Sequence, residues 1–239
     1  MKLSQILFSQ GFGTRKACAG LVWSGAVWHQ GRELDDPDED LPTTDLVLTI
    51  DGKPWPYHAQ ALVMLHKPTG YECSQKPKHH PSVMTLLPPP LRQRGVQPIG
   101  RLDEDTTGLL LFTDDGRLIH QLTSPKHHVP KVYEVGCKHA VDDSQVARLL
   151  AGVVLEDDPT PVRAAACEIT GPTALRLTLT EGKYHQVKRM LAAVGNRVEQ
   201  LHRSRFGHLH IPDDLAPGQW CWLPGWLPPA LDQPGTGSG

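Results

Sequence analysis

Short apolar runs separated by turn residues constrain the fold of this 239-residue chain more than any other feature. Residues 132–137 and 175–179 alternate apolar and polar side chains, and the apolar runs 61–65 and 109–112 each end near a turn. Alternation with a period of two indicates strands that have one buried face. Because no regular strand–helix repeat accompanies these strands, we expect an antiparallel or mixed sheet. The predicted fold class is α+β.

The first sixty residues are predicted to form a small module of two helices and short strands. Apolar residues recur at helical spacing over residues 3–7, and Thr14 is suited to cap a second helix. A hairpin is predicted over residues 26–34 and a strand over residues 46–50. Residues 54–58 contain two prolines and are predicted to be a linker.

A further helix is predicted near the end of the chain. Apolar side chains at positions i, i+3, i+4 and i+7 form one face of it, namely Val187, Met190, Leu191 and Val194. Lys188 and Arg189 fall near the N-terminal end of this helix, at the rim of the apolar face or away from it. Two cations therefore stand at a helix start.

Charge is distributed along the chain in opposed blocks. The formal net charge of -2 is the difference between 24 Lys and Arg and 26 Asp and Glu. Residues 1–32 contain bases but no acid, residues 33–51 contain acids but no base, and basic blocks follow at residues 66–101 and 181–210. We expect the first two blocks to be separate surfaces. Basic blocks are typical of nucleic-acid binding, and the alternative is that they are simply solvated faces.

Composition argues against several classes of protein. No apolar run approaches the about 18 residues of a membrane-spanning helix, and the first ten residues lack the continuous apolar centre of a signal peptide. The five cysteines lie far apart and form no C-x-x-C pair, so neither a disulfide framework nor a zinc site is predicted. We expect a cytoplasmic protein that binds no metal.

Residues 100–109, Gly-Arg-Leu-Asp-Glu-Asp-Thr-Thr-Gly-Leu, are the strongest candidate for a catalytic segment. They place a carboxylate between two glycine-flanked turns, immediately before an apolar strand. Such a position suits a nucleophile or a base at the edge of a cleft. An Asx-type cap is the alternative interpretation.

This segment resembles the signature of the RsuA branch of bacterial ribosomal RNA pseudouridine synthases, in which the aspartate after Gly-Arg-Leu is catalytic. The resemblance gives that role to Asp103. Other segments resemble the family in order and spacing. Residues 65–71 resemble its Lys-Pro-x-Gly turn, residues 131–133 its Lys-x-Tyr segment, and residues 181–190 the block that supplies a basic partner to the aspartate.

The resemblance implies roles for further side chains. Lys188 is the expected partner of the carboxylate, with Arg189 as the fallback. Tyr133 is expected to pack on the target base, and Leu201 and Arg101 to line the substrate pocket. Contacts with RNA are expected from six basic residues, namely Arg15, Lys16, Lys67, Lys131, His185 and Arg203.

The resemblance also implies a domain organisation. Residues 1–57 resemble a small alpha-L RNA-binding module that is shared with a small-subunit ribosomal protein. Residues 60–223 are predicted to be the catalytic domain, built on a mixed or antiparallel sheet with a central cleft. Residues 224–239, rich in Pro and Gly, are predicted to be a disordered tail.

The implied activity is the isomerisation of one uridine to pseudouridine in small-subunit (16S) rRNA, at the equivalent of uridine 516. The bond from ribose to N1 of uracil breaks and a bond to C5 forms, so no cofactor is expected. The carboxylate acts as a nucleophile or as a base. The expected partner is small-subunit rRNA or a pre-ribosomal particle, bound by a monomer. The alternatives are a large-subunit (23S) rRNA synthase of the same family and an RNA-binding or ribosome-assembly factor without catalysis.

Overall fold

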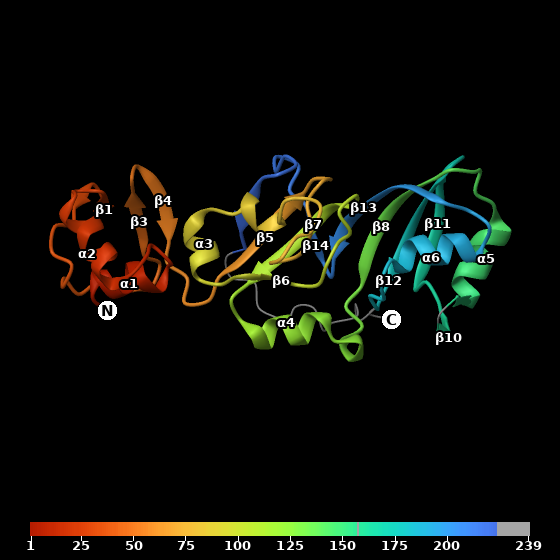
Figure 1. Ribbon diagram of the computed structural model, residues 1–239, viewed down its shortest axis with the longest axis horizontal. Helices are drawn as coiled ribbons and strands as arrows, with labels where there is room; N and C mark the ends of the chain where they lie inside the picture. Colours follow the sequence, from red (N-terminus) through yellow and green to blue (C-terminus); the bar gives the residue numbers. More distant parts are fainter. Residues whose placement is uncertain (157, 224–239) are drawn as a thin grey trace, which may run out of the picture. The chain divides into compact units, whose positions relative to one another are not determined.

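The computed structural model describes residues 1–156 and 158–223, which belong to two compact units. The first unit comprises Met1–Ala61 and Leu87–Gln97, and the second comprises Leu62–Leu86 and the described residues from Pro98 onward (Figure 1). Within these ranges no helix combines the length and the apolar character needed to cross a membrane. The predicted tail, residues 224–239, lies outside the described residues.

The first unit contains the two predicted helices, α1 (Leu3–Ser9) and α2 (Arg15–Trp23). The Oγ1 atom of Thr14 accepts a hydrogen bond of 3.2 Å from the backbone N–H of Ala17, which confirms the predicted cap. Four antiparallel strands lie in the order β2-β1-β3-β4. Their bounds are β1 Val27–His29, β2 Arg32–Glu33, β3 Val47–Ile50 and β4 Lys53–Pro56.

The prediction that residues 54–58 form a linker is wrong, because most of them belong to β4. Leu48 of β3 is the partner of Trp55, and Thr49 is the partner of Pro54. Since β4 lies at the edge of the sheet, prolines there remove no donor from an interior ladder. The nearly buried ring of Trp55 packs edge-on against Phe12, with centroids 5.0 Å apart.

A segment distant in sequence completes the first unit. Helix α3 (Pro89–Gln93) lies in Leu87–Gln97, inside the range that the sequence assigned to the catalytic domain. Arg94 Nη1 donates a 2.9 Å hydrogen bond to the side-chain oxygen of the buried Gln10. This contact joins residues 84 positions apart, which no local pattern indicates.

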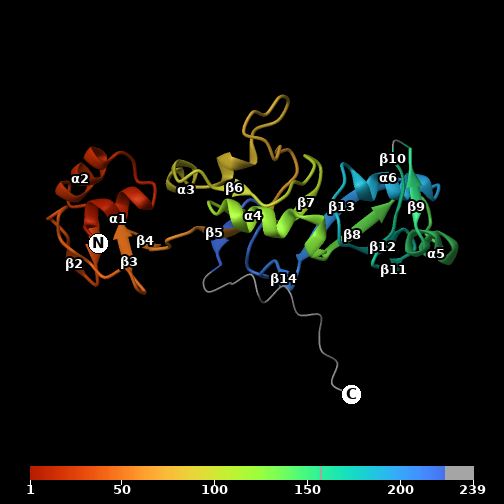
Figure 2. The same cartoon turned by 90° about the horizontal axis from the view of Figure 1, so that it is seen from below.

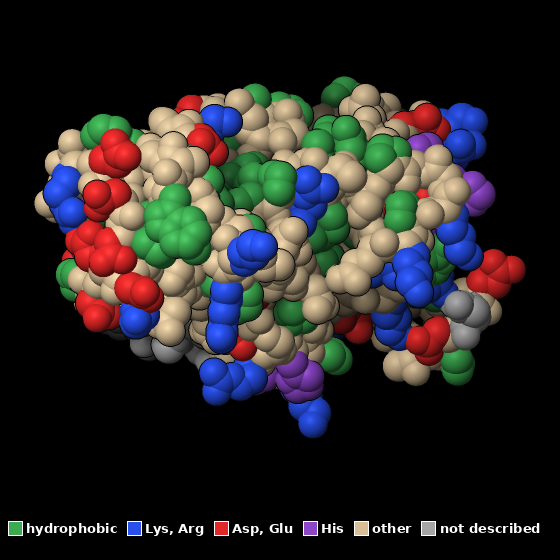
Figure 3. Space-filling model, turned by 60° about the vertical axis from the view of Figure 1, so that its left-hand side comes forward, with side chains coloured by type: hydrophobic (Ala, Val, Ile, Leu, Met, Phe, Trp, Pro, Cys, Tyr) green, Lys and Arg blue, Asp and Glu red, His purple; other side chains and the backbone are tan. Residues whose placement is uncertain are grey.

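The acidic and basic blocks of the first unit are not separate surfaces, contrary to expectation. Lys2 Nζ lies 2.9 Å from a carboxylate oxygen of Asp38, and Arg32 forms an ion pair with Glu39. Acidic side chains gather at the left of the view in Figure 3, with Lys and Arg side chains among them. Part of the basic charge that the sequence assigned to RNA is therefore paired within the unit.

The second unit is built on a mixed sheet in the order β11-β12-β8-β13-β7-β5-β15, with β14 and β6 paired to β13 and β7. Strands β7 and β13 run parallel, and the other pairs along this order run antiparallel. The bounds are β5 Leu62–Lys67, β6 Gln97–Pro98, β7 Thr107–Thr113, β8 Lys131–Cys137, β11 Ala166–Gly171, β12 Ala174–Leu179, β13 Val198–Phe206, β14 Leu209–His210 and β15 Trp220–Trp222. The predicted α+β fold with a mixed sheet is confirmed.

Helices and a small two-stranded sheet flank the mixed sheet. Helix α4 covers one face of β5 and β7 (Figure 1, Figure 2), where Leu118 and Leu122 pack against Met64, Leu109 and Leu111. Helix α5 packs on β11, and α6 packs on β9 and β13. Their bounds are α4 Gly116–Thr123, α5 Asp143–Ala151, α6 Gln186–Ala193, β9 Val153–Leu155 and β10 Asp158–Val162, with short 3-10 turns η1 Val83–Leu86 and η2 Pro125–His127.

The parallel contact between β7 and β13 depends on Gly108. This residue has φ +113°, and a Cβ atom added to it would lie 2.3 Å from the carbonyl oxygen of Arg203. Real Cβ atoms do not approach a backbone atom so closely, so only glycine lets the two strands pair here. The pairing places the loop before β7 beside the central strand β13.

Candidate active site

Asp103 lies in the loop of residues 100–106, which connects β6 to β7 and is called here the Asp103 loop. The loop closes on itself through a hydrogen bond of 3.1 Å from the Thr106 N–H to the Asp103 carbonyl. Leu102 is nearly buried, and its N–H donates to the Sγ atom of Cys73 at 3.5 Å. The Asp103 side chain keeps 26% of its surface exposed. The backbone of the loop is therefore held in place, while the Asp103 carboxylate remains accessible.

Lys67 binds the backbone of the Asp103 loop. It was predicted to contact RNA, but its side chain is not accessible to RNA. Its side chain is fully buried, and Nζ donates hydrogen bonds to the carbonyls of Pro68, Glu104 and Thr106 at 3.0, 3.1 and 2.8 Å. An ammonium has three donors and no acceptor, which matches three carbonyls. Burial lowers the pKa of Lys67, against the opposing influence of Cys73 and nearby carboxylates.

Replacing Lys67 by Met is expected to destabilise the second unit by about 2–4 kcal/mol. One buried and two partly buried carbonyls lose their donor, at about 1–3 kcal/mol for a fully buried group, while the cost of burying the charge is removed. Urea unfolding followed by circular dichroism measures the effect. Lys76→Met, at an exposed lysine of the same unit, is the matched control. Equal unfolding midpoints for the two variants would contradict this role of Lys67.

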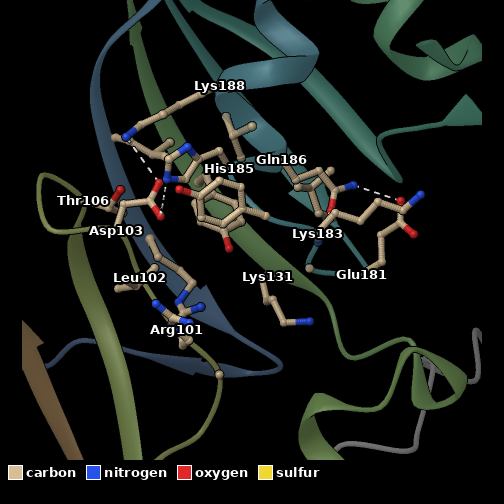
Figure 4. A pocket seen from close by; sticks show the side chains of 18 of the residues that line it. Arg101, Leu102, Asp103, Thr106, Lys131, Glu181, Lys183, His185, Gln186 and Lys188 are labelled. Carbon is tan, nitrogen blue, oxygen red and sulfur yellow. Dashed lines mark hydrogen bonds and ion pairs between the residues drawn. The ribbon is translucent and has the colours of Figure 1, made fainter. Parts of the chain in front are cut away.

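The two carboxylate oxygens of Asp103 have different partners. Oδ1 lies 3.2 Å from His185 Nε2, and Oδ2 lies 3.2 Å from Lys188 Nζ (Figure 4). His185 is the N-cap of α6 and has φ +48°, a backbone conformation that residues other than glycine rarely adopt. Lys188 lies in the first turn of the same helix. The start of α6 thus places both side chains on the carboxylate, where the helix dipole also favours negative charge.

Lys188 bridges two carboxylates of the Asp103 loop. Its Nζ lies 2.7 and 2.9 Å from the two oxygens of Asp105, in addition to the contact with Asp103. Burial lowers the pKa of Lys188, but the contacts with Asp105 and Asp103 outweigh burial, so its pKa is raised. Lys188 is accordingly a cation in the free protein. Asp105 holds it from the more exposed side, with 57% of its side-chain surface accessible.

Asp103 lines a cavity of about 380 Å³. Tyr133 on β8 and Leu201 on β13 form part of its wall and are nearly buried. Other walls come from the Asp103 loop, from the segment before α6 and from the start of β8. Small-molecule sites are commonly about 300–1,000 Å³ and combine apolar walls with a few polar groups. The cavity has the size and lining to hold one ring of a nucleotide.

The structure brings most of the predicted site residues together. The predicted residues that line the cavity with Asp103 are Arg101, Lys131, Tyr133, His185, Lys188, Leu201 and Arg203. Arg189 does not line it, because its Nη1 donates to the carbonyl of Tyr184 at 3.0 Å, so the fallback role of Arg189 is not supported. Arg15 and Lys16 lie exposed on α2 of the first unit.

Besides Lys67, two more residues that were predicted to contact RNA, His185 and Arg203, lie in the site itself and not on an open surface. His185 contacts Asp103 directly and belongs to the centre of the site. Arg203 is only 2% exposed, and its Nε donates a 2.9 Å hydrogen bond to the Leu109 carbonyl. It therefore lies inside the cavity wall and not on an open basic surface. In the sheet, Arg203 is paired with Gly108 of β7 on one side and with Tyr133 of β8 on the other.

Tyr184 is a site residue that the sequence reasoning did not single out. Its ring stacks on His185, with centroids 3.8 Å apart and planes at 20°, while 73% of the residue is exposed. It lines the cavity at its exposed margin. Its position immediately before His185, in the block 181–190, is the sequence feature that could have identified it.

The site combines an accessible carboxylate, a fixed cation and a cavity with aromatic and aliphatic walls. Within residues 1–156 and 158–223, no group of three His, Cys, Asp or Glu side chains is placed to hold a metal ion. A carboxylate held in this way suits nucleophilic or general-base chemistry on a bound ring. These features are typical of an enzyme site in which a carboxylate is the candidate nucleophile or base.

Comparison with known proteins agrees with this geometry. Residues 61–193 match the family model described as RNA pseudouridylate synthase. The "Ribosomal small subunit pseudouridine synthase A" of Yersinia pestis is 46% identical over 157 residues, 66% of this chain and 66% of that protein. The "Uncharacterized RNA pseudouridine synthase YtzG" of Bacillus subtilis (strain 168) is 38% identical over 92% of this chain and 93% of its own length.

A solved structure described as "Crystal structure of pseudouridylate synthase" has a TM-score of 0.65 at 32% identity and covers 93% of this chain and 96% of that one. The chain belongs to the RNA pseudouridylate synthase family. The resemblance inferred from the motifs is confirmed, and so is the prediction of an isomerase.

Proposed function

We propose that this protein isomerises one uridine to pseudouridine in small-subunit rRNA, at the equivalent of uridine 516, with Asp103 as the catalytic carboxylate. The named relatives support the substrate, since "Ribosomal small subunit pseudouridine synthase A" recurs among them at 44–46% identity. The proposed partner is small-subunit rRNA, alone or in a pre-ribosomal particle, and the protein acts on it in the cytoplasm as a monomer.

One observation carries the assignment of Asp103. Each oxygen of its carboxylate lies 3.2 Å from a nitrogen, one on Lys188 and one on His185, at the edge of the cavity. These two contacts fix the orientation of the carboxylate and place the Lys188 ammonium beside it. An ionised Asp103 is the species that either route requires, attack on the nucleoside or removal of a sugar proton.

The remaining side chains have roles in binding the uridine. The target base leaves its stack to enter the cavity, where the ring of Tyr133 offers a stacking surface and Leu201 an apolar contact. The glycosidic bond to N1 breaks, the uracil turns, and a bond from C1′ to C5 forms while C5 loses its proton and N1 takes one up. The reaction neither gains nor loses electrons.

The substrate assignment is tested with transcripts labelled with tritium at C5 of uridine. Formation of pseudouridine releases that tritium to water, so release counts converted uridines. The purified protein is expected to release one equivalent from small-subunit rRNA and none from large-subunit rRNA or tRNA. Release from large-subunit rRNA alone would favour the large-subunit alternative. Binding to rRNA without release from any transcript, free or assembled into a pre-ribosomal particle, would favour a non-catalytic assembly factor.

A further inference from the structure

Two of the cations that line the cavity, Lys131 and Arg203, lie on neighbouring strands and have no task in the mechanism above. Lys131 begins β8, Arg203 lies on the neighbouring strand β13, and both line the cavity. Lys131 Nζ and Arg203 Cζ lie 5.6 and 5.4 Å from the ring centroid of Phe206. Lys131 stands apart from the contacts of Asp103 with His185 and Lys188 (Figure 4). Two positive charges thus lie close to the Phe206 ring, in a part of the cavity separate from the Asp103 carboxylate.

One donor of the Arg203 guanidinium has no acceptor among the described residues. Its Nε is bonded to the Leu109 carbonyl, but Nη2 is enclosed and has no hydrogen-bond partner in the described part of the chain. The residue is 2% exposed. Buried donors of folded proteins are nearly always satisfied, by protein, ordered water or a ligand, so this N–H beside the cavity is a donor that a ligand in the cavity can use.

Lys131 also has donors for which the described residues supply no acceptor. Its Nζ donates one hydrogen bond, of 3.0 Å, to the Val129 carbonyl, and an ammonium has three donors. Burial, followed by repulsion from Arg203, lowers the pKa of Lys131 to about 8, and attraction by Glu181 only partly opposes this. Gln186 holds the Glu181 carboxylate through a 2.9 Å hydrogen bond. In the described part of the chain, the charges of Lys131 and Arg203 are therefore compensated only in part.

We propose that Lys131 and Arg203 form a subsite for a backbone phosphate of the nucleotide that carries the target uridine, an inference that rests on the proposed function. Phosphate oxygens accept hydrogen bonds from guanidinium and ammonium groups together and supply the missing negative charge. A nucleotide that turns out of its stack brings its own phosphates to the cavity. A carbonyl oxygen of the base would satisfy one donor and leave both charges uncompensated.

The test removes one phosphate charge from the RNA and one cation from the protein. Small-subunit rRNA fragments carry a single neutral methylphosphonate on the 5′ or the 3′ side of the target uridine. One of the two substitutions is expected to weaken binding to the wild-type protein about 10–100-fold, the size of a charge-assisted contact. Lys131→Met is expected to bind the unmodified fragment about tenfold more weakly and to lose less than about threefold on that substitution.

Lys138→Met is the matched control, because Lys138 is an exposed lysine just beyond the other end of β8 and does not line the cavity. It is expected to keep the full wild-type sensitivity to methylphosphonate. Wild-type binding that is indifferent to both substitutions overturns the proposal. So does a Lys131→Met protein that remains as sensitive as the wild type. Release of tritium from the unmodified fragment is measured in parallel, so failure of the proposed function is seen separately.

A second measurement does not depend on which RNA is the substrate. The titration of Lys131 is followed by NMR of the full-length protein labelled with ¹³C at lysine Cε, with uridine 5′-monophosphate or uridine added at saturation. The monophosphate is expected to raise the pKa of Lys131 by at least about one unit, and uridine is expected not to. Equal titration curves with the two compounds contradict a phosphate subsite at Lys131.

Discussion

Replacing Asp103 by Asn is expected to lower single-turnover pseudouridine formation by about 10⁴-fold or more. Asparagine keeps the shape of the side chain but provides neither a nucleophilic oxygen nor a base. The fold is expected to persist, because Lys188 retains its bidentate contact with Asp105. Tritium release at saturating protein measures the rate, and circular dichroism checks the fold.

Asp105→Asn is the matched variant for this experiment. Asp105 lies in the same loop and binds the same Lys188, but it is more exposed than Asp103 and does not line the cavity. It acts on Lys188 and not on the uridine, so its loss is expected to cost at most about tenfold in rate. A rate for Asp103→Asn within tenfold of the wild-type rate would show that Asp103 is not the catalytic carboxylate. So would a loss of rate for Asp105→Asn that exceeds the loss for Asp103→Asn.

Gly108→Ala is expected to destabilise the second unit by more than about 4 kcal/mol. The new methyl group would lie 2.3 Å from the carbonyl oxygen and 2.7 Å from the backbone nitrogen of Arg203, so β7 and β13 must separate. The φ of +113° adds backbone strain for alanine. Separation would also move the Asp103 loop away from the strand that carries Leu201. Urea unfolding monitored by circular dichroism measures the loss.

Gly116→Ala serves as the control for Gly108→Ala. Gly116 is the first residue of α4, and a Cβ atom there would meet no atom within 4 Å. Because alanine favours the helix, this variant is expected to be neutral or up to about 1 kcal/mol more stable than the wild type. If Gly108→Ala unfolded at the wild-type midpoint, the close approach of β7 and β13 would not be a requirement of the fold.

Local patterns predicted the elements that those patterns determine. The alternating runs in β8 and β12 are strands, Thr14 caps α2, and the apolar face of α6 is buried. The site could be located because Asp103 and Lys188 lie in motifs whose spacing resembles a family. In these cases the information needed is within about ten consecutive residues.

Features decided by tertiary contact could not be predicted. Strand β13 contains polar residues at most positions and has two register irregularities, so it shows no clear alternation although it lies inside the sheet. Lys67 and Arg203 were expected to contact RNA, because only the folded backbone reveals the carbonyls that bind them. The return of Leu87–Gln97 to the first unit depends in the same way on distant partners such as Gln10.

The central claim is that Asp103 converts one uridine of small-subunit rRNA. The most direct measurement maps pseudouridine by carbodiimide-dependent primer extension in cells that lack the gene and carry either the wild-type or the Asp103→Asn allele. The account predicts that deletion removes a single stop in small-subunit rRNA, at the equivalent of uridine 516, and that only the wild-type allele restores it. A stop restored by Asp103→Asn, or a stop lost from large-subunit rRNA instead, would contradict the account.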